Sequence, residues 1–118
     1  NGRSFGLSNN NWLTFGTLYN AQGSPLHIKM LVGHNSSGGY AEFTNDTYAY
    51  NIAAGTVVTI GNSSGSYTAQ IRKIKRVGGV GFSSGDGGWE YQIARNQAYG
   101  MAVTMHVMGA TSSWRWKV

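Results

Sequence analysis

The clearest pattern along the chain is an alternation of apolar and polar residues. It runs through four segments, which are residues 26–32, 88–94, 101–108 and 112–118. A period of two places successive side chains on opposite faces of a β-strand, so one face can be buried while the other meets solvent. In the third segment Thr104 and His106 lie on the polar face, opposite Met101, Val103, Met105 and Val107.

Five further segments alternate less regularly but have the composition of strands: residues 11–19, 39–44, 47–52, 56–60 and 66–77. In the last of them the apolar phase slips between Ile71 and Ile74, which predicts a β-bulge near Arg72 and Lys73. No segment has the length and period of a normal helix. We therefore predict an all-β fold, a single antiparallel β-sandwich or jelly roll of about eight short strands.

The composition agrees with this fold class. Gly accounts for 18 of the 118 residues and Pro for 1, and only 11% of the residues are charged. A chain of this length forms one domain, and we expect residues 11–118 to form it, with residues 1–10 connecting it to a preceding segment.

The chain has no Cys, which excludes disulfides and thiolate chemistry. No apolar run approaches the ~20 residues that span a bilayer, so we expect no membrane insertion.

The order of three longer phrases resembles the carboxy-terminal tip domains of bacteriophage tail fibres and tailspikes. The phrases are WLTFGTLYNAQGSPLHIKMLVG, then WEYQIARNQAYGMAVTMHVMG after a Gly- and Ser-rich middle, and a closing SSWRWKV. The resemblance implies a homotrimeric β-sandwich at the distal end of a virion's tail fibre, in an extracellular setting, that binds host lipopolysaccharide or capsule. It equally suits a terminal domain that drives trimer assembly. It assigns no binding role to any numbered residue.

Few residues are suited to catalysis. The only carboxylates are Glu42, Asp46, Asp86 and Glu90, and glycoside hydrolysis normally needs two of them, about 5 to 10 Å apart. Asp86 and Glu90 are four residues apart in sequence, and an extended chain places them about 13 Å apart. We interpret Asp86 as a turn residue and Glu90 as a solvent-facing strand residue. We therefore expect no catalytic residue and no enzyme.

Metal and cofactor sites also lack their usual residues. His27, His34 and His106 show neither HxH nor HExxH spacing. The stretch SSGDGG offers calcium a single side-chain anion, Asp86, where several are normally needed. We expect no metal and no cofactor.

The chain is basic, with nine Lys and Arg, four Asp and Glu, and a formal net charge of +5. The run RKIKR at residues 72–76 has three explanations: a nucleic-acid patch, a strand edge protected against self-pairing, or attraction to an anionic polysaccharide. Arg72 and Lys73 point to opposite faces of a strand, so the run does not form one basic stripe. We expect no nucleic-acid partner.

Aromatic residues carry the strongest functional signal, because flat rings stack on the C–H faces of sugars. Trp89, Trp114 and Trp116 lie on the apolar phase of their strands, so we expect them in the core or in a subunit contact. Three tyrosines flank a polar turn that could bond sugar hydroxyls, and one histidine lies on the polar face of its strand. The candidate ligand-binding residues are therefore Tyr40, Asn45, Asp46, Tyr48, Tyr50 and His106.

Together these features predict a binding module rather than an enzyme. The function expected first is host receptor recognition by a viral tail-fibre tip, which binds bacterial surface polysaccharide through exposed loops. The alternatives are a carboxy-terminal trimerisation domain without receptor binding and a secreted carbohydrate-binding lectin module.

Overall fold

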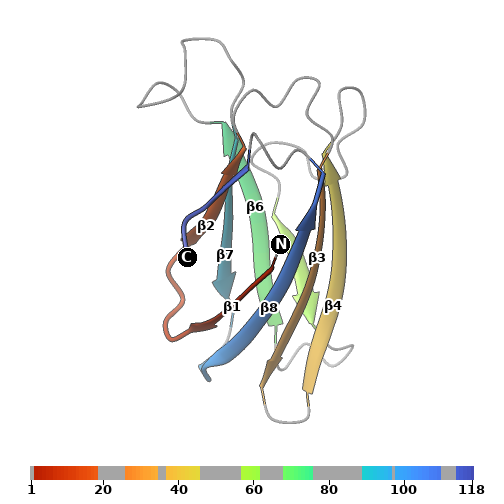
Figure 1. Ribbon diagram of the computed structural model, residues 1–118. Helices are drawn as coiled ribbons and strands as arrows, with labels where there is room; N and C mark the ends of the chain where they lie inside the picture. The colour runs from red at the N-terminus through yellow and green to blue at the C-terminus, as the bar shows by residue number, and fades with distance from the viewer. Residues whose placement is uncertain are drawn as a thin grey trace.

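The computed structural model describes residues 2–18, 26–34, 37–45, 57–61, 68–75, 89–96, 98–109 and 114–118. These residues form nine β-strands (Figure 1): β1 (Gly2–Leu7), β2 (Leu13–Leu18), β3 (Leu26–His34), β4 (Ser37–Asn45), β5 (Val58–Gly61), β6 (Thr68–Lys75), β7 (Trp89–Arg95), β8 (Met101–Met108) and β9 (Trp114–Trp116). In the described part of the chain, no helix is long and apolar enough to pass through a membrane.

The strands form two antiparallel sheets that face each other (Figure 1). The four-stranded sheet has the order β1-β8-β3-β4, and the five-stranded sheet has the order β5-β6-β7-β2-β9. Strands β3 and β4, and likewise β5, β6 and β7, pair with their neighbours in sequence. Strand β1 pairs with β8, and β2 with β7, so each sheet joins an early part of the chain to a late one. The predicted all-β sandwich is confirmed.

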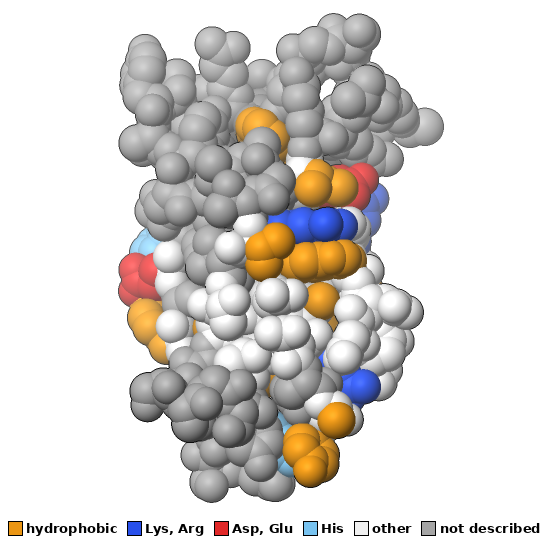
Figure 2. Space-filling model, turned by 180° about the vertical axis from the view of Figure 1, so that it is seen from behind, with side chains coloured by type: hydrophobic (Ala, Val, Ile, Leu, Met, Phe, Trp, Pro, Cys, Tyr) orange, Lys and Arg blue, Asp and Glu red, His pale blue; other side chains and the backbone are white. Residues whose placement is uncertain are grey.

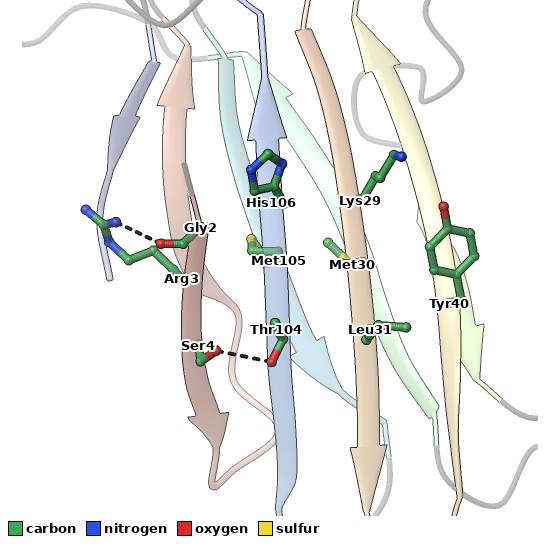
Figure 3. Close-up of a pocket in the computed structure, with 10 residues that line it drawn as sticks. All are labelled: Gly2, Arg3, Ser4, Lys29, Met30, Leu31, Tyr40, Thr104, Met105 and His106. Atoms are coloured by element: carbon green, nitrogen blue, oxygen red, sulfur yellow. Dashed lines mark hydrogen bonds between the residues drawn. The ribbon is translucent and has the colours of Figure 1, made fainter.

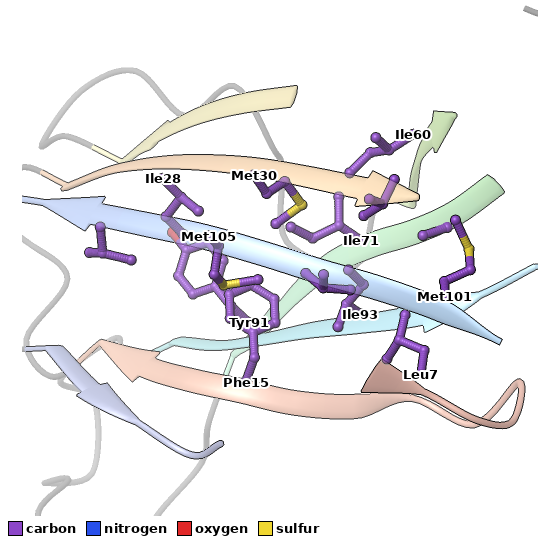
Figure 4. Close-up of a cluster of buried hydrophobic side chains, with 14 of the residues drawn as sticks. Leu7, Phe15, Ile28, Met30, Ile60, Ile71, Tyr91, Ile93, Met101 and Met105 are labelled. Carbon is purple, nitrogen blue, oxygen red and sulfur yellow. The ribbon is translucent and has the colours of Figure 1, made fainter. Parts of the chain in front are cut away.

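Apolar side chains fill the space between the two sheets (Figure 4). The alternating segments of the four-stranded sheet bury the phase predicted from the sequence, which is Ile28, Met30 and Val32 in β3 and Met101, Val103, Met105 and Val107 in β8. The five-stranded sheet contributes the buried residues Phe15, Ile71, Tyr91 and Ile93. The opposite phase of β8 is exposed, so this strand has one core face and one solvent face.

The β-bulge lies in a different strand from the one that the sequence predicts. Strand β6 pairs with β7 without interruption from Ala69 to Lys75, so the expected bulge near Arg72 and Lys73 is absent from this pairing. Ile71 is buried, whereas Ile74 lies on the opposite face and is half-buried there. The prediction was wrong because it required both isoleucines to be buried on one face. The register shifts instead in β2, between Thr14 and Gly16.

Gly16 follows the bulge and makes room for Trp114. A Cβ atom at Gly16 would overlap the indole ring of Trp114. That ring is buried and lies 6.2 Å from the ring centroid of Phe15 and 5.7 Å from that of Tyr91. Trp89 and Trp116 pack against the core while remaining partly exposed. The predicted burial is therefore complete for Trp114 and partial for the other two tryptophans.

Residues 2–7 belong to the sandwich, although the sequence predicts a connector over residues 1–10. Strand β1 pairs with β8 from Gly2 to Leu7, and Leu7 is buried in the core. The guanidinium of Arg3 lies 5.0 Å from the ring centroid of Trp116 in β9. This cation–π contact joins the edge strands of the two sheets.

The strand expected over residues 47–52 lies outside the described residues.

Candidate functional site

The outer face of the four-stranded sheet carries three rows of residues that the antiparallel register sets side by side. In the order β1, β8, β3 and β4, the first row is Gly2, His106, Lys29 and Glu42, the second is Ser4, Thr104, Leu31 and Tyr40, and the third is Gly6, Ala102, Gly33 and Gly38. The first row carries charge and the second combines hydroxyls with apolar side chains. The third row has no side chain larger than a methyl group.

A hollow of about 470 Å³, here called the first hollow, lies over the first two rows (Figure 3). Lys29 and His106 project from β3 and β8 at one end of it. Leu31 and Tyr40 lie on the side of β4. Ser4 lies on the side of β1, so side chains from all four strands surround one space.

Leu31 and Tyr40 form an apolar surface beside this hollow. They are direct cross-strand neighbours, and they are 56% and 55% exposed. The phenol of Tyr40 donates a hydrogen bond to Oε1 of Glu42, and Oε2 of Glu42 lies 3.0 Å from Nε2 of His27. Glu42 therefore holds the Tyr40 side chain on the sheet face. Large apolar side chains that are held in place yet exposed to solvent are typical of binding surfaces.

The opposite side of the first hollow is polar. Oγ of Ser4 and Oγ1 of Thr104 lie 3.1 Å apart and form a hydrogen-bonded pair of exposed hydroxyls. Each hydroxyl can also donate to or accept from a ligand. The described residues that line the first hollow include Lys29 but no carboxylate, and the guanidinium of Arg3, whose residue also lines it, is turned toward Trp116. The hollow therefore favours a ligand that is rich in hydroxyl groups and neutral or negatively charged.

A second hollow, of about 720 Å³, adjoins the first at Ser4 and Thr104, which line both. Its floor is formed by Gly6, Ala102 and Gly33 of the third row. His34 lines it as well, and its ring stacks on that of Tyr99 with the centroids 5.3 Å apart and the planes at 23°. Nδ1 of His34 lies 2.8 Å from the carbonyl oxygen of Gly100. This hydrogen bond fixes the imidazole at the end of the sheet.

The structure brings together two of the residues that the sequence singles out. Tyr40 and His106 both line the first hollow, from β4 and β8. Asn45 is the last residue of β4 and pairs with Leu26, beyond the rows that surround the hollow. Asp46, Tyr48 and Tyr50 lie outside the described residues.

The other residues of the first hollow were not predicted, because most of the candidate residues were expected at a polar turn. Ser4 lies in the segment expected to be a connector, and Leu31 is not among the residues singled out from the sequence. A signal was present for Leu31, since it occupies the polar phase of the alternation in residues 26–32. Only the strand pairing shows that Leu31, Thr104 and Tyr40 are neighbours.

The outer face of the five-stranded sheet carries a polar network. Oγ1 of Thr14 donates to Oε2 of Glu90 at 3.3 Å and accepts from Nε2 of Gln92 at 3.1 Å. Nε of Arg72 donates to Oε1 of Gln92 at 2.8 Å, and the Arg72 guanidinium lies 4.1 Å from the ring centroid of Trp12. Figure 2 shows the molecule from this side, with Lys or Arg side chains lying directly against hydrophobic ones. Glu90 thus takes part in a polar ladder, and Asp86 lies outside the described residues.

No group of three His, Asp or Glu side chains in the described part of the chain could hold a metal ion. Comparison of the chain with protein-family models, with curated proteins and with solved structures finds no match. The geometry of the outer face of the four-stranded sheet is therefore the basis for assigning a function.

Proposed function

We propose that this chain binds a polysaccharide of the bacterial surface, lipopolysaccharide or capsule, through the outer face of its four-stranded sheet. The observation that carries the proposal is the first hollow. It sets the exposed Leu31 and Tyr40 side chains opposite a pair of hydroxyls, with Lys29 at one end.

This combination suits the chemistry of sugars. A sugar ring has C–H faces that stack on an aromatic ring and hydroxyls that need donors and acceptors around the rim. Tyr40 offers the ring, while Ser4 and Thr104 offer hydroxyls on the facing side. Concave sites that combine apolar contact with a few placed polar groups are the usual form of small-ligand sites.

The resemblance of the chain to bacteriophage tail-fibre tips supports a bacterial glycan as the ligand and a virion as the setting. In this proposal the chain is a homotrimer at the end of a fibre. Three weak sites on one tip bind a dense polysaccharide coat far more firmly than one site does, because the later binding events are intramolecular.

A trimer-assembly domain is the competing function. Leu31, Tyr40 and Met108 are exposed, apolar and located on the outer face of the four-stranded sheet, which would also suit a contact between copies of the chain. The two functions differ in what removal of these side chains does. Removal weakens glycan binding in one case and dissociates the oligomer in the other.

The test is binding of the fluorescently labelled chain to a panel of bacterial strains, before and after enzymatic removal of capsule and O-antigen. We expect strain-selective staining that disappears with the polysaccharide. Tyr40→Ala and Leu31→Ala should each weaken it by about tenfold, the loss expected for a central aromatic or apolar contact. Ile74→Ala, which truncates a half-buried residue on the outer face of the five-stranded sheet, is the control and should bind normally.

Two results would contradict the proposal. Staining of no strain on a broad panel, with Tyr40→Ala reducing the mass of the particle in solution, would indicate an assembly domain. Loss of staining in Tyr48→Ala or Tyr50→Ala but not in Tyr40→Ala would move the site to the turn that the sequence favours.

A further inference from the structure

We infer that the second hollow extends the site, so that the sheet face binds a chain of several sugar units lengthwise along β8 rather than one terminal sugar. This inference rests on the proposed function and adds to it the length and direction of the ligand.

The two hollows form one continuous surface. Ser4 and Thr104 line both, and their hydrogen-bonded hydroxyls lie at the junction. His106 lines the first hollow and lies in β8, and Gly100 lines the second hollow and directly precedes β8. Six residues of β-strand at about 3.3 Å each give a surface of about 20 Å, which accommodates several linked rings.

The floor of the second hollow is open for a reason other than packing. A Cβ atom at Gly6 would lie 3.8 Å from its nearest neighbour, the carbonyl oxygen of Met101, which is an ordinary contact. The fold therefore tolerates a side chain at Gly6, unlike Gly16, where the Trp114 ring occupies the space. Glycine is also an unfavourable residue within a strand. Its presence at Gly6, beside the exposed Ala102, keeps the surface low where a ligand would pass.

An aromatic platform ends the surface. Tyr99 is 57% exposed and stacks on His34, whose ring is fixed by its contact with the Gly100 carbonyl. Tyr40 lies beside the first hollow and Tyr99 beyond the second, with the Ser4 and Thr104 hydroxyls between them. A polysaccharide repeats C–H faces and hydroxyls along its length, so its successive units match this order of groups.

The charge of the surface agrees with the same ligand. Lys29 lies at the first hollow, and the described residues that line the second include no carboxylate. Capsules and lipopolysaccharides that carry phosphate or carboxylate groups would place these anions at the basic end. The low floor admits the remaining units.

The experiment measures how affinity depends on ligand length. The probes are purified capsular and O-antigen polysaccharides, together with oligosaccharides of increasing length prepared from them, and the method is titration calorimetry. For the wild-type chain we expect affinity to rise by at least about tenfold between the shortest and the longest oligosaccharide. In Gly6→Val that increase should disappear, while the shortest oligosaccharide binds as before.

The melting temperature separates a blocked surface from a damaged fold. Val favours strands more than Gly does, so Gly6→Val should melt no lower than the wild type. Ala102→Val places a similar obstruction on the neighbouring strand and should have the same effect on long oligosaccharides. Thr59→Val, on an exposed position of β5 in the other sheet, is the control and should retain the dependence on length.

Four results would overturn the inference. If short and long oligosaccharides bind the wild type equally, or if folded Gly6→Val keeps the increase, the ligand does not use the second hollow, although the proposed function stands. If no polysaccharide binds the wild type, both fail. If Gly6→Val dissociates an oligomer without changing glycan affinity, a second copy of the chain covers this surface.

Discussion

Gly16 and Gly6 both lie in strands, but their missing side chains serve different purposes. At Gly16 the space that a Cβ would occupy belongs to the indole of Trp114, which joins β9 to the core. At Gly6 the nearest atom to such a Cβ is 3.8 Å away. The first glycine is therefore required by packing, and the second is free to vary without cost to the fold.

This difference gives a prediction for alanine at the two positions. Gly16→Ala should lower the free energy of unfolding by about 1–3 kcal/mol, because the added methyl overpacks the Trp114 contact. Gly6→Ala should leave that free energy unchanged or raise it slightly, since alanine restricts the unfolded chain. Urea unfolding followed by tryptophan fluorescence measures both. Equal effects at the two positions would show that Trp114 does not lie over Gly16.

Strand β8 is the element that links the fold to the proposed site. Its inward residues Met101, Val103, Met105 and Val107 are buried, and its outward residues Thr104 and His106 line the first hollow. A shift of one residue in its register would exchange the two sets, because side chains alternate along a strand. The core and the hollow therefore depend on the same register.

Two neighbouring substitutions in β8 test that register. Val103→Thr keeps the shape of the side chain but buries a hydroxyl, and it should cost about 1–3 kcal/mol of unfolding free energy. Thr104→Val removes an exposed hydroxyl and should change stability by less than about 0.5 kcal/mol. Urea unfolding of both variants gives the comparison. A larger loss for Thr104→Val than for Val103→Thr would mean that the strand faces the other way.

The strands that could be predicted from the sequence are those with one clearly apolar phase. Strands β3, β7 and β8 alternate cleanly because one face of each packs against the opposite sheet. The bulge in β2 could not be located this way, since it adjoins the glycine that accommodates Trp114, nearly the whole chain away. Ile74 misled the prediction because a half-buried isoleucine and a core isoleucine look alike in sequence.

The candidate site was predictable only in part, for a similar reason. Tyr40 and His106 were each selected from their own strand, by an aromatic ring beside a turn and by a polar phase. Their shared location depends on the pairing of β3 with both β4 and β8, which a local pattern does not specify. The floor of the second hollow is a row of small residues drawn from β1, β8 and β3, so each strand alone shows only an unremarkable Gly or Ala.

Across the whole molecule, nine basic and four acidic side chains give a net charge of +5. The described basic residues differ in setting: Arg72 lies on Trp12 at the five-stranded sheet, while Lys29 is exposed at the first hollow. A general positive charge attracts any polyanion to every face, but a charge beside the ligand contributes to one site. Removing single charges at different places separates the two effects.

Lys29→Gln and Lys117→Gln lower the net charge equally, and only the first removes a charge from the first hollow. For a phosphate- or carboxylate-bearing polysaccharide, we expect affinity to fall as NaCl is raised, since the screening length shrinks from about 10 Å at 0.1 M to about 3 Å at 1 M. Lys29→Gln should weaken binding at low salt severalfold and flatten this dependence, whereas Lys117→Gln should follow the wild type closely. Titrations over a salt series, with a neutral polysaccharide as the reference ligand, measure the slopes. Identical slopes for the two variants would mean that the net charge attracts the polyanion and that Lys29 does not contact it.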